Sequence, residues 1–94
     1  MILPLVSIII PVRNEAGLLK NCLESISNLD YPKERIEVVI ADGMSTDGTA
    51  EVARQYGARV VLNEKKTVSP GRNVAFKPAK GEIIAFTDAD CIVD

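Results

Sequence analysis

Two aspartates separated by one residue, Asp88 and Asp90, follow the apolar run from Glu82 to Thr87. Carboxylates that leave a strand into a turn with this spacing can share a hard divalent cation, which prefers oxygen ligands and leaves room for phosphates and water. A cation held there would act as a Lewis acid on a departing diphosphate. The pair therefore predicts a site for Mn²⁺ or Mg²⁺ next to a phosphate-bearing ligand.

Other acidic residues also follow apolar runs. Glu15 comes shortly after residues 6–12, Asp42 follows residues 36–41, and Glu64 follows residues 59–63. A single acidic loop residue is usually just solvated. In an open parallel sheet, however, ligands bind beyond the carboxyl ends of the strands, so acidic groups gathered at that edge favour a binding site.

The alternation of elements along the chain indicates how these residues are positioned. Continuous apolar runs predict strands, and apolar residues at helical spacing predict helices between them. Asn14 is the expected cap of the first helix, Ser45 or Thr46 that of the second, and Gly57 its stop. The strands are expected at residues 6–12, 36–41, 59–63 and 82–87, and the helices at 16–29, about 46–56, and a short or kinked one from 69. This order predicts an α/β fold, a three-layer α/β/α sandwich with a mainly parallel sheet.

Composition excludes several classes of function. The 94 residues are 47% hydrophobic and 26% charged with a net charge of −2, which is typical of a globular domain and offers no basic surface for nucleic acid. The chain has no histidine, so a Ser-His-Asp triad and a Cys-His nucleophile are excluded. Cys22 and Cys91 lie far apart without a C-x-x-C pair, so a zinc site is not expected and both are interpreted as packing residues.

Location and extent follow from the ends of the sequence. No apolar stretch reaches the length of about 20 residues that a membrane span requires, and the start lacks a basic region typical of a secretory signal. A cytoplasmic location is expected, with membrane association of a longer parent left open. The chain stops four residues after Asp90, which predicts that residues 1–94 are a truncated part of a larger domain.

Four motifs in order resemble glycosyltransferase family 2, whose catalytic domain has the GT-A fold. They are VSIIIP at residues 6–11 with Asn14-Glu15, DGMSTDGT at 42–49, GRN at 71–73, and KGEIIAFTDAD at 80–90. The resemblance covers nearly the whole chain. It implies the nucleotide-sugar-binding half of an inverting, metal-dependent enzyme, with strand order 3-2-1-4. The implied donor is a UDP- or GDP-sugar, and the acceptor (glycan, lipid or protein) stays open.

The same resemblance implies roles for individual residues. Pro11 and Glu15 would line the nucleoside pocket, and Asp42 would accept a hydrogen bond from the base. Arg72 would approach the base or the diphosphate, for which its planar fork of donors is suited. Asp88 would contact the ribose or the metal, and Asp90 would ligate the metal.

Three departures from the family pattern affect these roles. Gly43 replaces a frequent second aspartate, and Ala75 and Pro78 make the geometry after Arg72 hard to predict. The family's catalytic base lies well downstream of the D-x-D, so no catalytic residue is expected within this chain and the base is expected beyond residue 94.

Other readings of the sequence fit less well. A nucleotidyltransferase should have a glycine-rich loop after its first strand, but residues 11–17 read PVRNEAG. A response-regulator receiver needs paired acids there and a lysine after a fifth strand, and a P-loop is absent. The alternative of another class is a non-catalytic nucleotide-binding or oligomerising module derived from the family. Truncation would expose the strand at 82–87, so a homo-oligomer paired through that edge is expected.

Overall fold

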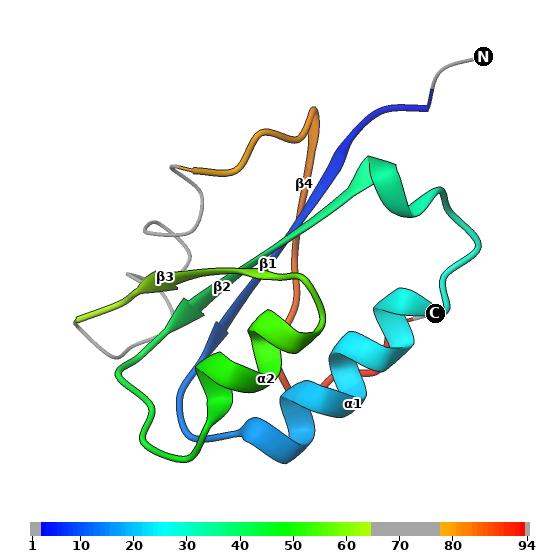
Figure 1. Ribbon diagram of the computed structural model, residues 1–94. Coiled ribbons are helices and arrows are strands. Elements are labelled where there is room, and N and C mark those ends of the chain that lie inside the picture. Colours follow the sequence, from blue (N-terminus) through cyan, green and yellow to red (C-terminus); the bar gives the residue numbers. More distant parts are fainter. Residues whose placement is uncertain (1–2, 65–77, 94) are drawn as a thin grey trace.

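The computed structural model describes residues 3–64 and 78–93, and the strands expected from sequence are confirmed to within one residue at each end. Figure 1 shows the elements along the chain. In order, they are β1 (Val6–Val12), α1 (Ala16–Ser27), the 3-10 turn η1 (Lys33–Arg35), β2 (Ile36–Asp42), α2 (Thr49–Gln55), β3 (Arg59–Leu62) and β4 (Ile83–Phe86). The helix expected from residue 69 lies outside the described residues. None of the helices in the described ranges is long and apolar enough to span a membrane.

The four strands form one parallel sheet in the order β3-β2-β1-β4, which confirms the expected topology. β1 lies between β2 and β4, so the carboxyl ends of these three strands meet at the same edge of the sheet. Val12 pairs with Asp42 on one side of β1, and Ile9 pairs with Phe86 on the other.

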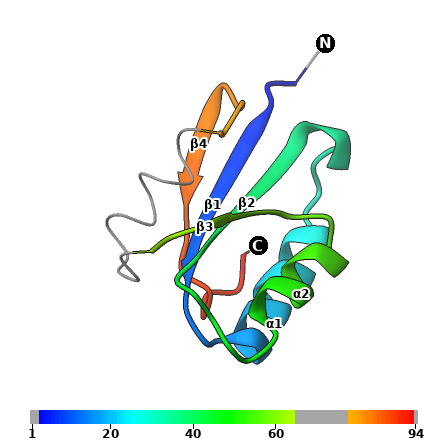
Figure 2. The same cartoon turned by 60° about the vertical axis from the view of Figure 1, so that its left-hand side comes forward.

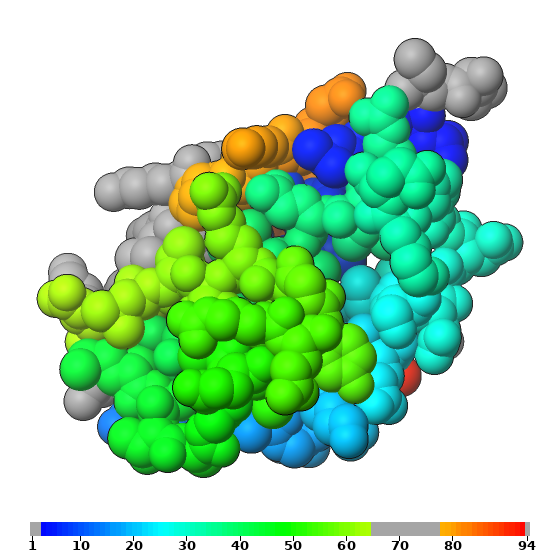
Figure 3. Space-filling model, viewed as in Figure 1, coloured from blue at the N-terminus to red at the C-terminus, as the bar shows by residue number. Residues whose placement is uncertain are grey.

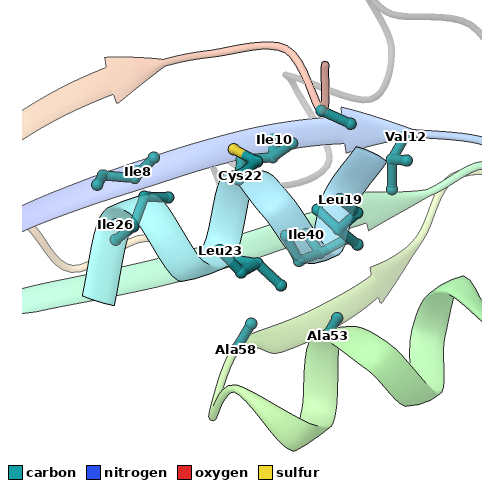
Figure 4. Packing of buried hydrophobic residues seen from close by; sticks show 11 residues of the cluster. Ile8, Ile10, Val12, Leu19, Cys22, Leu23, Ile26, Ile40, Ala53 and Ala58 are labelled. Atoms are coloured by element: carbon teal, nitrogen blue, oxygen red, sulfur yellow. The ribbon is translucent and has the colours of Figure 1, made fainter. Parts of the chain in front are cut away.

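Buried side chains lie on both faces of this sheet. Both α1 and α2 cover the same face (Figures 1 and 2). Alternate β1 residues, Ile8 and Ile10, point toward α1, where Cys22 and Leu23 meet them (Figure 4). On the opposite face Ile9 is fully buried in a second cluster. The other buried members of that cluster are Val39 and Ala41, with Val61, Ala79 and Ile84 packed against them. Burial on both faces explains why the strands read as continuous apolar runs.

The two helices also contact each other. Their surfaces adjoin in the space-filling view, α1 in blue to cyan and α2 in green (Figure 3). The Tyr56 hydroxyl, directly after α2, donates a hydrogen bond of 2.8 Å to Glu24 Oε1 on α1. Gly57 then ends α2 with φ 76°, and the amides of Gly57 and Ala58 bond back to carbonyls of the last turn. The predicted glycine stop is therefore confirmed.

The helix caps differ from the sequence prediction. Asn14 does not cap α1; the N-cap residue is Glu15, and it makes no side-chain cap hydrogen bond. Neither Ser45 nor Thr46 caps α2, whose N-cap is Gly48 with φ 87°. At α1 the prediction failed because the side chain that accepts the Ala16 amide, Asp47, comes from another loop. At α2 the side chain that accepts the Thr49 amide is Asp47 again, two residues before that helix, and not Ser45 or Thr46. α1 also ends at Ser27, two residues earlier than predicted.

The amino-terminal edge of β4 is fixed beside β1 by a polar contact. The Gly81 amide donates a hydrogen bond of 2.7 Å to Ser7 Oγ, and the Ser7 hydroxyl donates one of 2.5 Å to Glu37 Oε2. The Lys80 amide donates to the same Glu37 oxygen at 2.8 Å. These bonds join β1, β2 and the residues before β4 near the amino ends of the strands, opposite to the edge where Asp42 and Asp88 lie. They therefore fix where β4 begins and, with it, the position of the D-x-D that follows.

Candidate functional site

Parallel pairing brings two of the predicted site residues, Asp42 and Asp88, to one edge of the sheet. Asp42 ends β2 beside Val12, the last residue of β1. On the other side of β1, the Thr87 amide donates a hydrogen bond of 3.1 Å to the Ile9 carbonyl, which leads Asp88 to the same edge. Carboxylates that are 46 positions apart in sequence (42 and 88) therefore flank the end of one strand.

Asp42 is a nearly buried carboxylate, with 7% of its surface exposed. Its Oδ1 accepts a hydrogen bond of 3.1 Å from the Ser45 amide, the one bond that its side chain makes within the described residues. Pro11 is also buried and pairs with Ala41, the residue before Asp42. A carboxylate in this setting has acceptor capacity left, so it can bind a donor group of a ligand against an apolar wall.

Glu15 occupies the turn between β1 and α1. It is half-buried, and its carbonyl accepts the Leu19 amide at 2.8 Å as the first bond of α1. The residues on each side of it, Asn14 and Ala16, are both hydrogen-bonded to the loop between β2 and α2. Glu15 thus lies next to the loop that carries Asp42.

The D-x-D forms a turn whose two carboxylates are exposed while the residue between them is buried. Ala89 is 2% exposed and belongs to the core cluster of α1. The Cys91 amide donates to the Asp88 carbonyl at 3.1 Å and closes the turn. Ligand atoms of Asp88, Asp90 and Cys91 all lie within 4.8 Å of one another. The oxygens of the two carboxylates are therefore close enough together to bind one hard divalent cation, which prefers oxygen ligands at about 2.0–2.6 Å.

The two cysteines behave differently. Cys22 is buried, as predicted, and its thiol lies 3.9 Å from the Asp88 carbonyl oxygen. The pKa of Cys22 is raised to about 11, mainly by burial and to a smaller extent by the nearby Cys91 and Asp90. Cys22 therefore remains a thiol at neutral pH. The interpretation of Cys91 as a packing residue is wrong: it is exposed, and its sulfur lies 3.9 Å from Asp90 Oδ1. Its position directly after Asp90, in the acidic turn, was the sequence feature that could have predicted its exposure.

One predicted site residue, Arg72, lies outside the described residues, so its role stays a prediction. A cavity of about 370 Å³ opens at the amino edge of the sheet, lined among others by Lys33, Tyr56 and Arg59, and contains no predicted site residue. The loop contacts of Asn14, Ser45 and Asp47 were missed because they join residues 31 or more positions apart.

Comparisons with known proteins agree with this geometry. The family model "Glycosyl transferase family 2" matches residues 7–94. The chain is 39% identical to the glycosyltransferase AglE of Haloferax volcanii, covering 95% of this chain and 31% of that protein. It is 41% identical to a poly(ribitol-phosphate) beta-glucosyltransferase of Bacillus spizizenii, covering 90% of this chain and 14% of that one. The chain thus spans a third or less of the length of these curated relatives.

Solved structures show the same likeness. The mannosyltransferase PcManGT of Pyrobaculum calidifontis, in complex with GDP-Man and Mn²⁺, superposes with a TM-score of 0.82 at 36% identity, over 96% of this chain and 28% of that one. S. aureus TarS 1-349 in complex with UDP-GlcNAc gives a TM-score of 0.82 at 34% identity, over 92% and 26%. The chain belongs to glycosyltransferase family 2, and its parallel sheet is part of a GT-A fold.

Proposed function

We propose that this chain binds a nucleoside-diphosphate sugar, a UDP- or GDP-sugar, together with a divalent cation. It would serve as the donor-binding part of an enzyme that transfers the sugar to an acceptor hydroxyl with inversion. The observation that supports this proposal is the meeting of Asp42 and the Asp88–Asp90 turn on the two sides of β1. Two similar structures were solved with GDP-Man and Mn²⁺ and with UDP-GlcNAc, which supports the choice of ligand.

The residues on the two sides of β1, around Asp42 and around Asp88 and Asp90, differ in burial and therefore suit different parts of the donor. Asp42, with Pro11 and Glu15 beside it, is nearly buried and suits the nucleoside, whose base offers N–H donors to a carboxylate. Asp88 and Asp90 are exposed and suit a cation together with the diphosphate. A bound Mn²⁺ or Mg²⁺ would neutralise charge on the departing nucleoside diphosphate. The chain's own carboxylates hold and orient the donor between these two points.

Transfer itself needs groups that we place outside these 94 residues. Inversion requires a base that deprotonates the acceptor hydroxyl and a surface that positions the acceptor. Since the chain spans only 31% and 14% of its two relatives named above, both functions are assigned to the remainder of a longer enzyme. The 94-residue polypeptide should therefore bind donor without transferring sugar, and a transfer assay with labelled UDP- and GDP-sugars tests this.

The free polypeptide should also self-associate through β4. Within the described residues β4 pairs with β1 alone, and Ile83 and Phe86 are each about half exposed. A strand edge of this kind is a template for pairing with another chain. Sedimentation should show a dimer or larger species, and a monomer at high concentration would refute the exposed-edge proposal.

Calorimetric titration tests donor binding. UDP and GDP are each titrated with and without Mn²⁺, and UMP and GMP serve as matched controls that lack the second phosphate. We expect one of the two diphosphates to bind in a Mn²⁺-dependent way and its monophosphate to lose most of that dependence. A purely oligomerising module would bind none of the four nucleotides, and that result would refute the proposal.

A further inference from the structure

Three hydrogen bonds join the β1–α1 loop to the β2–α2 loop at the candidate site. The Asn14 amide donates to Ser45 Oγ at 2.8 Å, and Asn14 Oδ1 accepts the Thr46 amide at 2.8 Å. The Ala16 amide, at the start of α1, donates to Asp47 Oδ2 at 3.1 Å. We call Asn14, Ser45 and Asp47 the loop clasp, because each of these side chains accepts a hydrogen bond from the opposite loop.

The residue types suit these contacts. Asn14 has φ 52°, a left-handed conformation that asparagine adopts more readily than most residues. Asp47 accepts from the Thr49 hydroxyl and amide at the start of α2 as well as from Ala16. The pKa of Asp47 is lowered, mainly by the hydrogen bond from the Thr49 hydroxyl and next by that from the Ala16 amide. Its carboxylate is therefore charged at neutral pH. One carboxylate therefore binds free amides at the starts of both helices.

Ser45 extends the loop clasp to a predicted ligand-binding residue. Its hydroxyl accepts the Asn14 amide, while its own amide donates to Asp42 Oδ1 at 3.1 Å. Glu15, the residue after Asn14, is thereby connected to Asp42 through two hydrogen bonds, with Asn14 and Ser45 between them. Asn14 and Asp47 are exposed residues, and α1 and α2 contribute buried residues to one core cluster, so we expect the fold to persist when one clasp bond is removed.

We propose that Asn14, Ser45 and Asp47 are positioning residues that hold Glu15 and Asp42 in one fixed arrangement before the nucleotide arrives. The ligand in this proposal rests on the proposed function, whereas the coupling of the two loops does not. A prearranged pair of side chains loses less freedom on binding, so it binds more tightly. None of the three clasp residues needs to contact the nucleotide for this effect.

The first test needs no ligand. Amide hydrogen exchange is measured by NMR in the wild type, in Ser45→Ala, which removes the acceptor for the Asn14 amide, and in Ser45→Thr, which keeps a hydroxyl. We expect exchange at amides 14 and 45 to be about three- to tenfold faster in Ser45→Ala, the range for one neutral hydrogen bond, and to return toward wild type in Ser45→Thr. Unchanged exchange at amide 45 in Ser45→Ala would show that Asp42 is not coupled to the other loop and would overturn the proposal.

A second pair of variants keeps the test independent of residue 45. Asn14→Gly tolerates the positive φ and keeps the backbone amide but loses the acceptor for Thr46, while Asn14→Asp keeps an acceptor there. Amide 46 should exchange faster in Asn14→Gly and recover in Asn14→Asp. Equal exchange in both variants would count against a role of the Asn14 side chain.

The nucleotide titration then separates the two proposals. If wild type binds UDP or GDP, Ser45→Ala should bind it about three- to tenfold more weakly, with a thermal midpoint close to wild type and with recovery in Ser45→Thr. Equal affinity in wild type and Ser45→Ala would overturn the positioning role. If wild type binds neither nucleotide, the proposed function fails, and the exchange experiment still decides whether the clasp couples the loops.

Discussion

The thiol of Cys22 lies 3.9 Å from the carbonyl oxygen of Asp88, so the D-x-D turn rests on the buried face of α1. Ala89 adds an apolar anchor to the same core, and the Val93 amide donates to Ser25 Oγ at 2.8 Å further along α1. The support of the turn thus comes from backbone atoms and from Ala89. Asp88 and Asp90, which carry the carboxylates of the D-x-D, are both exposed residues.

Asp90→Ala should abolish metal-dependent nucleotide binding while leaving the fold intact, because Asp90 is the proposed ligand of the cation and is an exposed residue. Calorimetry with and without Mn²⁺ measures the first effect, and circular dichroism the second. Asp30→Ala, an exposed acid far along the chain, is the matched control. Unchanged Mn²⁺-dependent affinity in Asp90→Ala would remove this residue from the metal site.

Asp42→Ala should weaken nucleotide binding to a similar degree with and without Mn²⁺, because its proposed partner is the base. Loss of a hydrogen bond to a charged group corresponds to roughly 1.5–3 kcal/mol, or about 10- to 150-fold in affinity. Titrations of the variant under both conditions measure the loss. A loss seen only when Mn²⁺ is present would instead assign Asp42 to the metal site.

Gly81→Ala should destabilise the protein by about 1–3 kcal/mol, the usual cost of forcing extra atoms into a packed site. A Cβ at Gly81 would lie 2.5 Å from both Ser7 N and Ser7 Oγ and 2.9 Å from the Ile83 carbonyl. Gly17→Ala is the matched control, since nothing lies within 4 Å there and alanine is the better helix former. Urea unfolding should rank the proteins Gly17→Ala, wild type, Gly81→Ala; a Gly81→Ala protein as stable as wild type would contradict the close approach.

Glu37 should make stability depend on pH in the acid range. Burial alone would raise the pKa of its carboxyl, but hydrogen bonds from the Lys80 amide and the Ser7 hydroxyl, with the charges of Arg59 and Lys80, lower the pKa below its usual 4.5. A lowered folded-state pKa stabilises the protein above the unfolded-state pKa, and this stabilisation is lost as pH falls through the folded-state value. The free energy of unfolding should therefore decrease as pH drops below about 4.5.

Urea unfolding of Glu37→Gln across the same pH range checks this prediction. The variant should be less stable than wild type at pH 7, and the difference should shrink toward low pH. Glu34→Gln, an exposed glutamate on η1, serves as the control and should leave the pH profile of wild type unchanged. A constant difference between Glu37→Gln and wild type at every pH would show that this carboxyl does not contribute.

The strands and their order could be predicted because the parallel sheet is buried on both faces, so β1 and β2 appear as apolar runs that end in the site residues. The placement of Asp42 and Asp88 at one edge followed from that topology. The hydrogen bond at the start of α1 could not be predicted from local sequence, because the Ala16 amide bonds to Asp47, 31 positions away. The exposure of Cys91 could not be predicted either, because the sequence does not show which residue of the turn is buried. In the structure that residue is Ala89, and Cys91 is exposed.

The most direct measurement of where donor and cation bind is paramagnetic broadening of amide signals when Mn²⁺ is added in the presence of UDP or GDP. Signals of residues 88–91 should broaden first, and those at the end of β2 near Asp42 should shift on adding the nucleotide without Mn²⁺. Signals around Lys33 and Arg59, which line the cavity at the opposite edge, should stay sharp. Broadening centred on that cavity, or spread evenly over the protein, would contradict a donor site at the carboxyl edge of the sheet.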